Sequence, residues 1–145
     1  MTNQIRHVWT VICQKSSIDT NSNLLSLFEI LEKVDINLNP AVQNIPEGQV
    51  LSIPFNFEII SYWRKGSQNK GEGKVRLVSP EGKQLNEFPF EVVIPQNLSA
   101  YRVVAKVSGL SFTTSGEYKI EILQKVGKEF QVVAEVPFDI VIHKQ

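Results

Sequence analysis

Residues 130–142 read Phe-Gln-Val-Val-Ala-Glu-Val-Pro-Phe-Asp-Ile-Val-Ile, and this stretch decides the fold. Every even position is apolar, whereas most odd positions are polar or tolerate water. Alternation with a period of two is typical of a β-strand with one buried face, because a helix would scatter these side chains around its circumference. We therefore expect a strand whose core face carries Phe130, Val132, Phe138 and Ile140. Pro137 lacks an amide hydrogen and predicts an edge position, a bulge or a crossing between sheets.

The same period recurs along most of the chain, which predicts further strands. The expected strands, besides the last, cover residues 8–13, 50–63, 74–79, 88–94, 101–107 and 118–122. Residues 126–128 supply a turn between the last two strands, and Pro-Glu-Gly-Lys at 80–83 supplies another. The glycine-rich residues 70–74 are interpreted as a flexible hairpin tip, because they lack a phosphate-loop pattern.

Residues 24–36 fit two patterns. Leu24, Leu27, Phe28 and Leu31 have helical spacing, and Asn23 could cap such a helix. Alternate positions of the same segment are also apolar, which fits a strand. Because every other element is a strand, we favour a strand here while keeping the helix as the alternative.

About seven to nine short strands separated by turns predict an all-β fold, an immunoglobulin-like antiparallel β-sandwich without a disulfide. The chain has 145 residues and shows no repeat, low-complexity block or long linker. Residues 1–145 are therefore expected to form a single domain, long enough to bury a core.

Two resemblances support this fold. Residues 115–120, Ser-Gly-Glu-Tyr-Lys-Ile, resemble the approach to the second-to-last strand of immunoglobulin domains, where a tyrosine hydroxyl bonds to upstream backbone. The corresponding tyrosine is Tyr118. Antibody domains carry a cysteine two residues later, whereas this chain has Ile120, so an antibody-type disulfide is excluded.

The chain also resembles a family of small uncharacterised bacterial proteins, a domain of unknown function. The resemblance rests on Val-Trp-Thr-Val-Ile-Cys at 8–13, Leu-Ser-Leu-Phe-Glu-Ile at 25–30, Leu-Val-Ser-Pro-Glu-Gly at 77–82 and Gly-Glu-Tyr at 116–118. It implies a β-sandwich from a bacterium and supplies no catalytic or binding residue.

Composition narrows the classes of function. Fifteen basic and fifteen acidic side chains balance, which argues against a surface devoted to nucleic acid or anionic membrane. Cys13 is the only cysteine and excludes an internal disulfide. The sequence shows no secretory signal and no apolar run of roughly 20 residues, so we expect no membrane association and a cytoplasmic location.

The residues that carry chemistry are scattered, so we expect a protein that is not an enzyme and holds no cofactor or metal. His7 and His143, the only histidines, lie near opposite ends of the chain; they could meet in a sandwich but are interpreted as exposed strand ends. Cys13 ends an apolar strand and is interpreted as a core residue. The aspartates are spaced too widely for a calcium loop.

One cluster combines aromatic rings with cations: Tyr62, Trp63, Arg64, Lys65 and Lys70. Stacking together with phosphate contacts could bind an anionic ligand such as single-stranded nucleic acid. The alternative is structural, because Trp63 has the parity of the core-facing residues of its strand. We favour the structural interpretation and hold the cluster as the candidate binding site.

The sequence therefore predicts a non-enzymatic interaction or structural module that acts through contacts with a protein partner or a second copy of itself. The long last strand is the candidate edge for self-pairing. The alternative is a β-sandwich that binds a small ligand, a carbohydrate or an anionic polymer, with Tyr62 or Tyr101 as stacking residues. A nucleic acid partner is not favoured.

Overall fold

The computed structural model describes residues 4–39, 46 and 48–144, and this part of the chain contains nine strands and no helix. The strands are β1 (Arg6–Ile18), β2 (Leu25–Ile30), β3 (Lys33–Leu38), β4 (Leu51–Arg64), β5 (Lys70–Val78), β6 (Gln84–Val93), β7 (Ala100–Phe112), β8 (Gly116–Val126) and β9 (Glu129–Lys144). The all-β prediction is confirmed.

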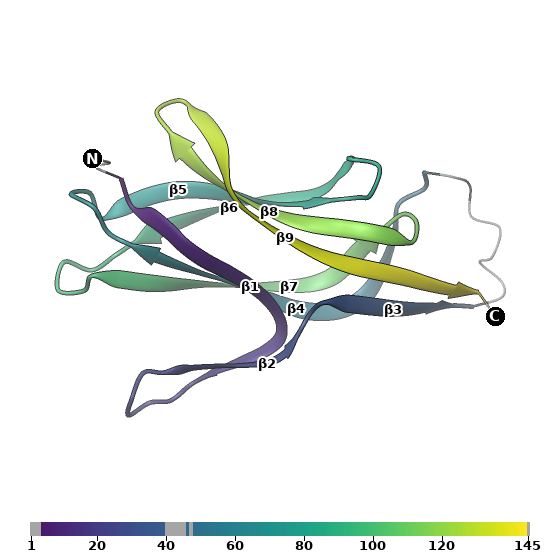
Figure 1. The fold of residues 1–145 in the computed structure, drawn as a ribbon, viewed down its shortest axis with the longest axis horizontal. Helices are drawn as coiled ribbons and strands as arrows, with labels where there is room; N and C mark the ends of the chain where they lie inside the picture. Colours follow the sequence, from purple (N-terminus) through teal and green to yellow (C-terminus); the bar gives the residue numbers. More distant parts are fainter. Residues whose placement is uncertain (1–3, 40–45, 47, 145) are drawn as a thin grey trace.

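The strands form two sheets that pack face to face (Figure 1). One sheet has four strands in the order β2-β1-β4-β7, and the other has five in the order β3-β9-β8-β5-β6. All pairs are antiparallel except β3 with β9, which is parallel. The expectation of purely antiparallel sheets is therefore wrong at the β3 edge. The chain reaches β3 directly from β2 of the other sheet, so no hairpin joins β3 to its neighbour β9. The result is an immunoglobulin-like β-sandwich without a disulfide.

The core lies between the sheets and is built by the alternating apolar positions. Phe57, Ile59 and Trp63 of β4 face it from the four-stranded sheet, and Ile120 and Ile122 face it from β8. Trp63 is fully buried and its ring packs 5.8 Å from the ring of Phe90 in the opposite sheet. Its indole nitrogen donates a 2.8 Å hydrogen bond to the Ser61 hydroxyl, so the one polar atom of this side chain is satisfied.

The expected tyrosine corner is present at the start of β8. The Tyr118 hydroxyl donates to the Thr114 carbonyl at 2.6 Å and accepts the amides of Thr113 at 2.8 Å and Thr114 at 3.1 Å. Tyr118 is fully buried, and its ring packs 5.9 Å from Phe138. This side chain therefore fixes the β7–β8 connection to the core.

Residues 24–36 are strand, not helix. β2 pairs with β1 from Ile18 opposite Leu25 to Cys13 opposite Ile30, and β3 then joins the other sheet. The hairpin turn is shaped by Asp19, whose carboxylate accepts the amides of Asn21 and Ser22. The apolar residues at helical spacing thus lie in β2 and in the segments on either side of it, because pairing with β1 overrides the local helical propensity.

Two further expectations are wrong, one on where β5 begins and one on which side chains of β9 face the core. β5 begins at Lys70, so residues 70–74 are paired strand instead of a flexible tip. In β9 the register shifts where Ile122 faces Ala134 and Leu123 faces Val132, which inserts Val133 as an extra residue. This bulge reverses the parity before it, so Val133 packs against the core whereas Phe130 and Val132 do not.

The last strand is also not a free edge along its whole length. Residues 139–144 of β9 lie between β3 and β8, and only residues 129–138 are left with β8 as their single neighbour among the described strands. Pro137 falls in that half, as a residue without an amide hydrogen should. The bulge at Val133 and Pro137 both disfavour strand addition there, and self-pairing through this half of β9 stays a prediction.

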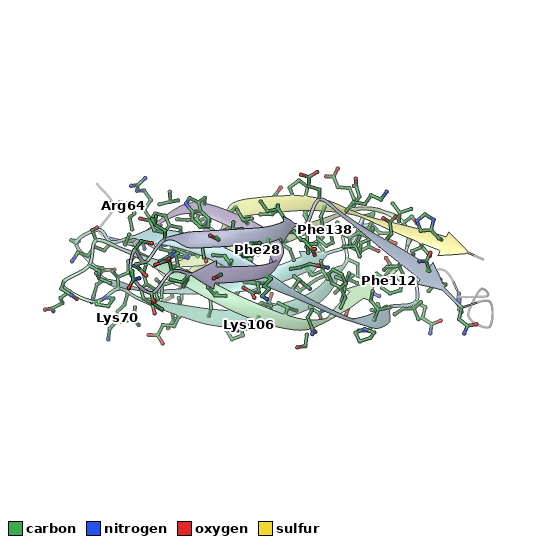
Figure 2. The ribbon with its side chains drawn as sticks, turned by 90° about the horizontal axis from the view of Figure 1, so that it is seen from below. Phe28, Arg64, Lys70, Lys106, Phe112 and Phe138 are labelled. Carbon is green, nitrogen blue, oxygen red and sulfur yellow. The ribbon has the colours of Figure 1, made fainter. Side chains whose placement is uncertain are left out.

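β1 curves strongly and turns back near its middle (Figure 1). Its first half pairs with β4 up to Cys13, and its second half pairs with β2 alone. We call residues 14–30 of this β1–β2 hairpin the hairpin arm. In Figure 2 the arm crosses the near side of the sandwich, and its strand β2 forms one edge of the four-stranded sheet.

Candidate functional site

The outer face of the four-stranded sheet is organised in rows by the strand register. The rows across β1, β4 and β7 are Arg6–Arg64–Ala100, Trp9–Tyr62–Arg102, Val11–Ile60–Val104 and Cys13–Glu58–Lys106. Residues directly opposite in adjacent strands share a face. This face therefore changes from cationic, through aromatic and apolar, to buried within four rows.

The hairpin arm covers part of the last two rows, at Ile60 and Cys13. Cys13 and Ile60 have no exposed surface although they lie outside the core between the sheets. Two polar contacts tie the arm down: the Ser16 hydroxyl donates to the Glu58 carboxylate, and Arg102 donates to the carbonyl and side-chain oxygens of Asn23 at 2.8 and 3.2 Å. The arm is thus a cover that residues distant from it in sequence hold in place.

Between the arm and the row of Trp9, Tyr62 and Arg102 lies a groove of about 580 Å³, which we call the arm groove. Its walls are mostly apolar, and among the described residues that line it none is acidic and Arg102 is the charged one. Several large apolar side chains around it are unusually exposed. They are Ile18 at 47%, Leu24 at 70%, Leu98 at 42% and Tyr101 at 43%.

The floor of the arm groove is an aromatic pair. Trp9 and Tyr62 stack with centroids 5.4 Å apart and planes 19° apart, and both side chains are partly exposed. A guanidinium nitrogen of Arg64 donates to the Tyr62 hydroxyl at 3.4 Å. This arrangement offers a flat apolar surface with a cation at its edge.

The arginines around this pair have no acidic partner among the described residues. Arg6 and Arg64 lie directly opposite each other across β1 and β4, and Arg102 lies opposite Tyr62. The ion pairs of the described chain all involve lysines, Arg76 or His143 instead. Opposed like charges destabilise a sheet, so this end of the molecule holds uncompensated positive charge.

The structure separates the residues of the predicted cluster. Tyr62 and Arg64 lie together on the outer face, whereas Trp63 fills the core. The Lys65 ammonium donates to the Gln96 carbonyl at 2.9 Å, and Lys70 opens β5 in the other sheet. Figure 2 shows Arg64 and Lys70 at one end of the sandwich but on different sides. Tyr101, the alternative stacking residue, borders the arm groove from the edge strand β7.

Sequence reasoning missed Trp9, Arg6 and Arg102 as members of this face. The three residues come from β1 and β7, and only pairing through β4 brings them beside Tyr62. The alternation in each strand showed that these side chains point away from the core, but it did not show which strand lies next to them. The arm groove itself carries no sequence signal, because it depends on where β1 curves away from β4.

The histidines do not meet. His7 packs edge-on against the Trp63 ring at 5.1 Å and bonds to the Thr10 hydroxyl at 2.6 Å, and burial lowers its pKa. Burial raises the pKa of Cys13, assisted by the charge of Glu58, which keeps the thiol protonated. In the part of the chain that the structure describes, no three His, Cys, Asp or Glu side chains gather as metal ligands.

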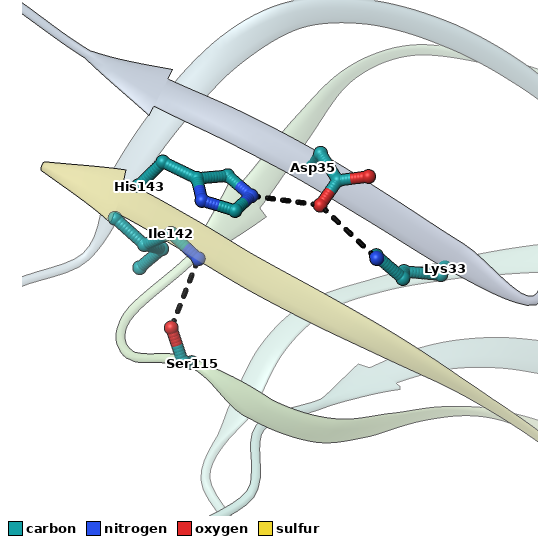
Figure 3. A network of polar contacts seen from close by, with 5 residues as sticks. All are labelled: Lys33, Asp35, Ser115, Ile142 and His143. Atoms are coloured by element: carbon teal, nitrogen blue, oxygen red, sulfur yellow. Dashed lines mark hydrogen bonds and ion pairs between the residues drawn. The ribbon is translucent and has the colours of Figure 1, made fainter.

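His143 instead joins an exposed ionic network at the opposite end (Figure 3). It bonds to Asp35 of the parallel neighbour β3 at 2.9 Å, and Lys33 lies 3.4 Å from the same carboxylate oxygen. The hydrogen bond from His143, with Lys33 nearby, lowers the pKa of Asp35. Ser115 accepts the Ile142 amide on the other side of β9. These contacts hold the β3 edge and frame no cavity.

Two smaller hollows lie elsewhere. One of about 570 Å³ lies beside the hairpin arm between Lys15, Phe28 and Phe55, and one of about 360 Å³ lies on the five-stranded sheet around Phe90 and Phe130. The first lacks an aromatic stack. In the second, the Lys74 ammonium already lies 4.4 Å from the Phe130 ring. The arm groove is therefore the best-formed candidate site.

Comparison of the chain with protein-family models and with curated proteins gave no match. The resemblance to the bacterial family of unknown function stays an expectation. The described residues contain no helix with the length and apolar character needed to cross a membrane.

Proposed function

We propose that this chain is a non-enzymatic interaction module that binds a protein partner through the arm groove. The observation that carries the proposal is the set of exposed apolar side chains around the groove, led by Leu24 and Leu98. Exposed apolar clusters beside a concave surface are typical of binding sites, because water gains from their burial. A bacterial origin and a cytoplasmic location fit this proposal and remain part of it.

A site-specific cross-linking experiment tests the proposal. A photoreactive amino acid replaces Leu98 in the chain expressed in its native cells, and irradiation is expected to give a discrete protein adduct. Leu24→Asp should abolish that adduct without unfolding the chain, since Leu24 is 70% exposed. The control places the same photoreactive residue at Lys128, in the β8–β9 turn. The same adduct from both positions, or its persistence in the Leu24→Asp variant, would contradict the proposal.

The stacked pair Trp9–Tyr62 favours a second candidate, a small ligand, carbohydrate or anionic polymer that stacks on the groove floor. Fluorescence of Trp9 is the natural reporter, because Trp63 is buried in the core. Titration with a panel of oligosaccharides, nucleotides and heparin should then quench emission at micromolar to millimolar concentrations. Trp9→Phe should remove the response; quenching that survives this change would place the ligand elsewhere.

A further inference from the structure

The surroundings of the arm groove are positively charged on one side and apolar on the other, and this difference indicates the chemistry of its ligand. The row of Arg6 and Arg64 lies directly beside Tyr62 of the groove floor, and Val104, which lines the groove, lies two rows away from Arg64. Consecutive rows are two residues apart along β4 and β7, about 7 Å, so the rows of Arg64 and Val104 are separated by about 13 Å. An extended peptide covers that span with about four residues.

We infer that the arm groove binds a short acidic-apolar segment of a partner protein, with carboxylates at Arg6 and Arg64 and apolar side chains towards Val104. This inference rests on the proposed function and adds the chemistry of the partner. Charge complementarity carries it: Arg6 and Arg64 face each other without an acidic neighbour in the described structure. A carboxylate between two guanidinium groups would accept from both and relieve their repulsion.

The distribution of charge favours a peptide over a nucleic acid. A single-stranded nucleic acid needs cations that follow its backbone along the whole site. Here Arg6 and Arg64 lie in one row beside the groove, and Arg102 is the one charged residue among the described residues that line it. The walls are formed by residues such as Ile18, Leu24 and Leu98. Apolar side chains, not phosphates, match those walls.

Arg102 has a different role from the other two arginines. One of its guanidinium nitrogens already donates to Asn23 and holds the hairpin arm. Arg102 also lines the arm groove. We therefore leave Arg102 unchanged in the binding test, because its loss would alter the arm as well as the charge.

Arg6→Glu separates binding from stability. The change replaces two opposed like charges by an opposed Glu–Arg pair, so it should raise the melting temperature while it weakens binding of an acidic ligand. A general loss of structure would lower both. Lys128→Glu is the matched control, because it makes the same charge reversal from a basic to an acidic side chain at an exposed turn of the other sheet.

The probe is a fluorescein-labelled peptide in which two glutamates precede Leu-Phe-Leu, followed by fluorescence anisotropy at low salt. The purified full chain should bind this peptide, with affinity at least about fivefold weaker for Arg6→Glu and unchanged for Lys128→Glu. Affinity should also fall as NaCl rises from about 50 to about 500 mM. A second peptide with glutamines in place of the glutamates should bind at least about fivefold more weakly.

Three results would overturn the inference. Equal affinity for the glutamate and glutamine peptides would leave an apolar groove, and with it the proposed function, but remove the acidic partner. Tighter binding of a labelled twelve-residue oligothymidylate than of the acidic peptide would assign the arginines to nucleic acid. No binding of either peptide overturns the inference as well, and the cross-linking experiment at Leu98 then decides separately whether the groove meets a protein.

Discussion

The guanidinium of Arg102 on β7 donates hydrogen bonds to both the carbonyl and the side-chain oxygen of Asn23, at the tip of the hairpin arm. Asn23 has a positive φ of 59°, which an asparagine tolerates better than most residues. A contact between an edge strand and a turn thus converts a projecting hairpin into one wall of a groove. The groove exists because of this tertiary contact.

Loss of that contact should loosen the arm and leave the sandwich folded. In Arg102→Ala, we expect faster amide hydrogen exchange in residues 16–27, because the remaining tether is the bond from Ser16 to Glu58. Exchange in β4 and β8 should be unchanged. Lys106→Ala, on the same strand and face, is the control. Equal exchange in the arm of both variants would show that Arg102 does not hold it.

The thiol of Cys13 reports on the same cover. It is fully buried beneath the arm, and burial with the Glu58 charge raises its pKa, so the native protein should react slowly with a disulfide reagent near pH 8. Arg102→Ala should increase the rate, because the arm opens more often. Full labelling of the native chain at the rate of an unfolded chain would contradict this account of the arm.

The tyrosine corner should contribute measurably to stability. Tyr118→Phe removes a hydroxyl that makes three hydrogen bonds to backbone, and leaves the amides of Thr113 and Thr114 and the Thr114 carbonyl without this partner. We expect a loss of about 1–3 kcal/mol in the free energy of unfolding, measured with urea. Tyr62→Phe, whose hydroxyl accepts one long bond from Arg64, should change it much less. Equal losses would deny the corner a structural role.

Gly73 is expected to be required for the close approach of β5 to its neighbours. A β-carbon there would lie 2.6 Å from the Leu123 carbonyl oxygen and would overlap the Phe90 ring. Gly73→Ala should therefore cost about 1–3 kcal/mol, since backbone cannot move as easily as a side chain. Gly71→Ala is the matched comparison, because its β-carbon meets only the flexible end of Ile5. A larger loss at Gly71 would reverse this interpretation.

His7 should make stability fall as the pH drops below about 6.5. Burial beside Trp63 lowers its pKa below the value near 6.5 of an unfolded chain, so the unfolded state binds a proton more readily. Its contribution is complete above pH 6.5 and is lost as the pH falls through the lowered folded pKa. His7→Gln should flatten this part of the urea-stability profile, whereas His143→Gln should keep the decline. An unchanged slope in His7→Gln would assign it to other groups.

Much of the fold was readable from local pattern. Alternation along 130–142 and 118–122 predicted paired strands, and the Gly-Glu-Tyr sequence predicted the corner at Tyr118, because a strand face and a tyrosine clamp each depend on a few neighbouring residues. Where a single extra residue enters, the pattern misleads. Val133 shifts the register of β9, so Phe130 and Val132 lie away from the core although their parity predicted the opposite.

The candidate site was readable only in part. Tyr62 and Arg64 are neighbours in sequence and share a strand face, so they could be selected together. Trp9 and Arg102 could not, because the strand order places them beside Tyr62 from opposite ends of the chain. The separation of Lys70 from this group likewise follows from its entry into the other sheet.

The amino-acid sequence alone determined that the chain is a two-layered β protein. Apolar and polar side chains alternate along each strand, and this alternation decides which face of the strand is buried. The tertiary structure decided which strands became neighbours. It also decided where β1 turns away from β4, and this turn places the hairpin arm beside Tyr62. Pairing energies depend on partners far away along the chain, and no local stretch contains that information.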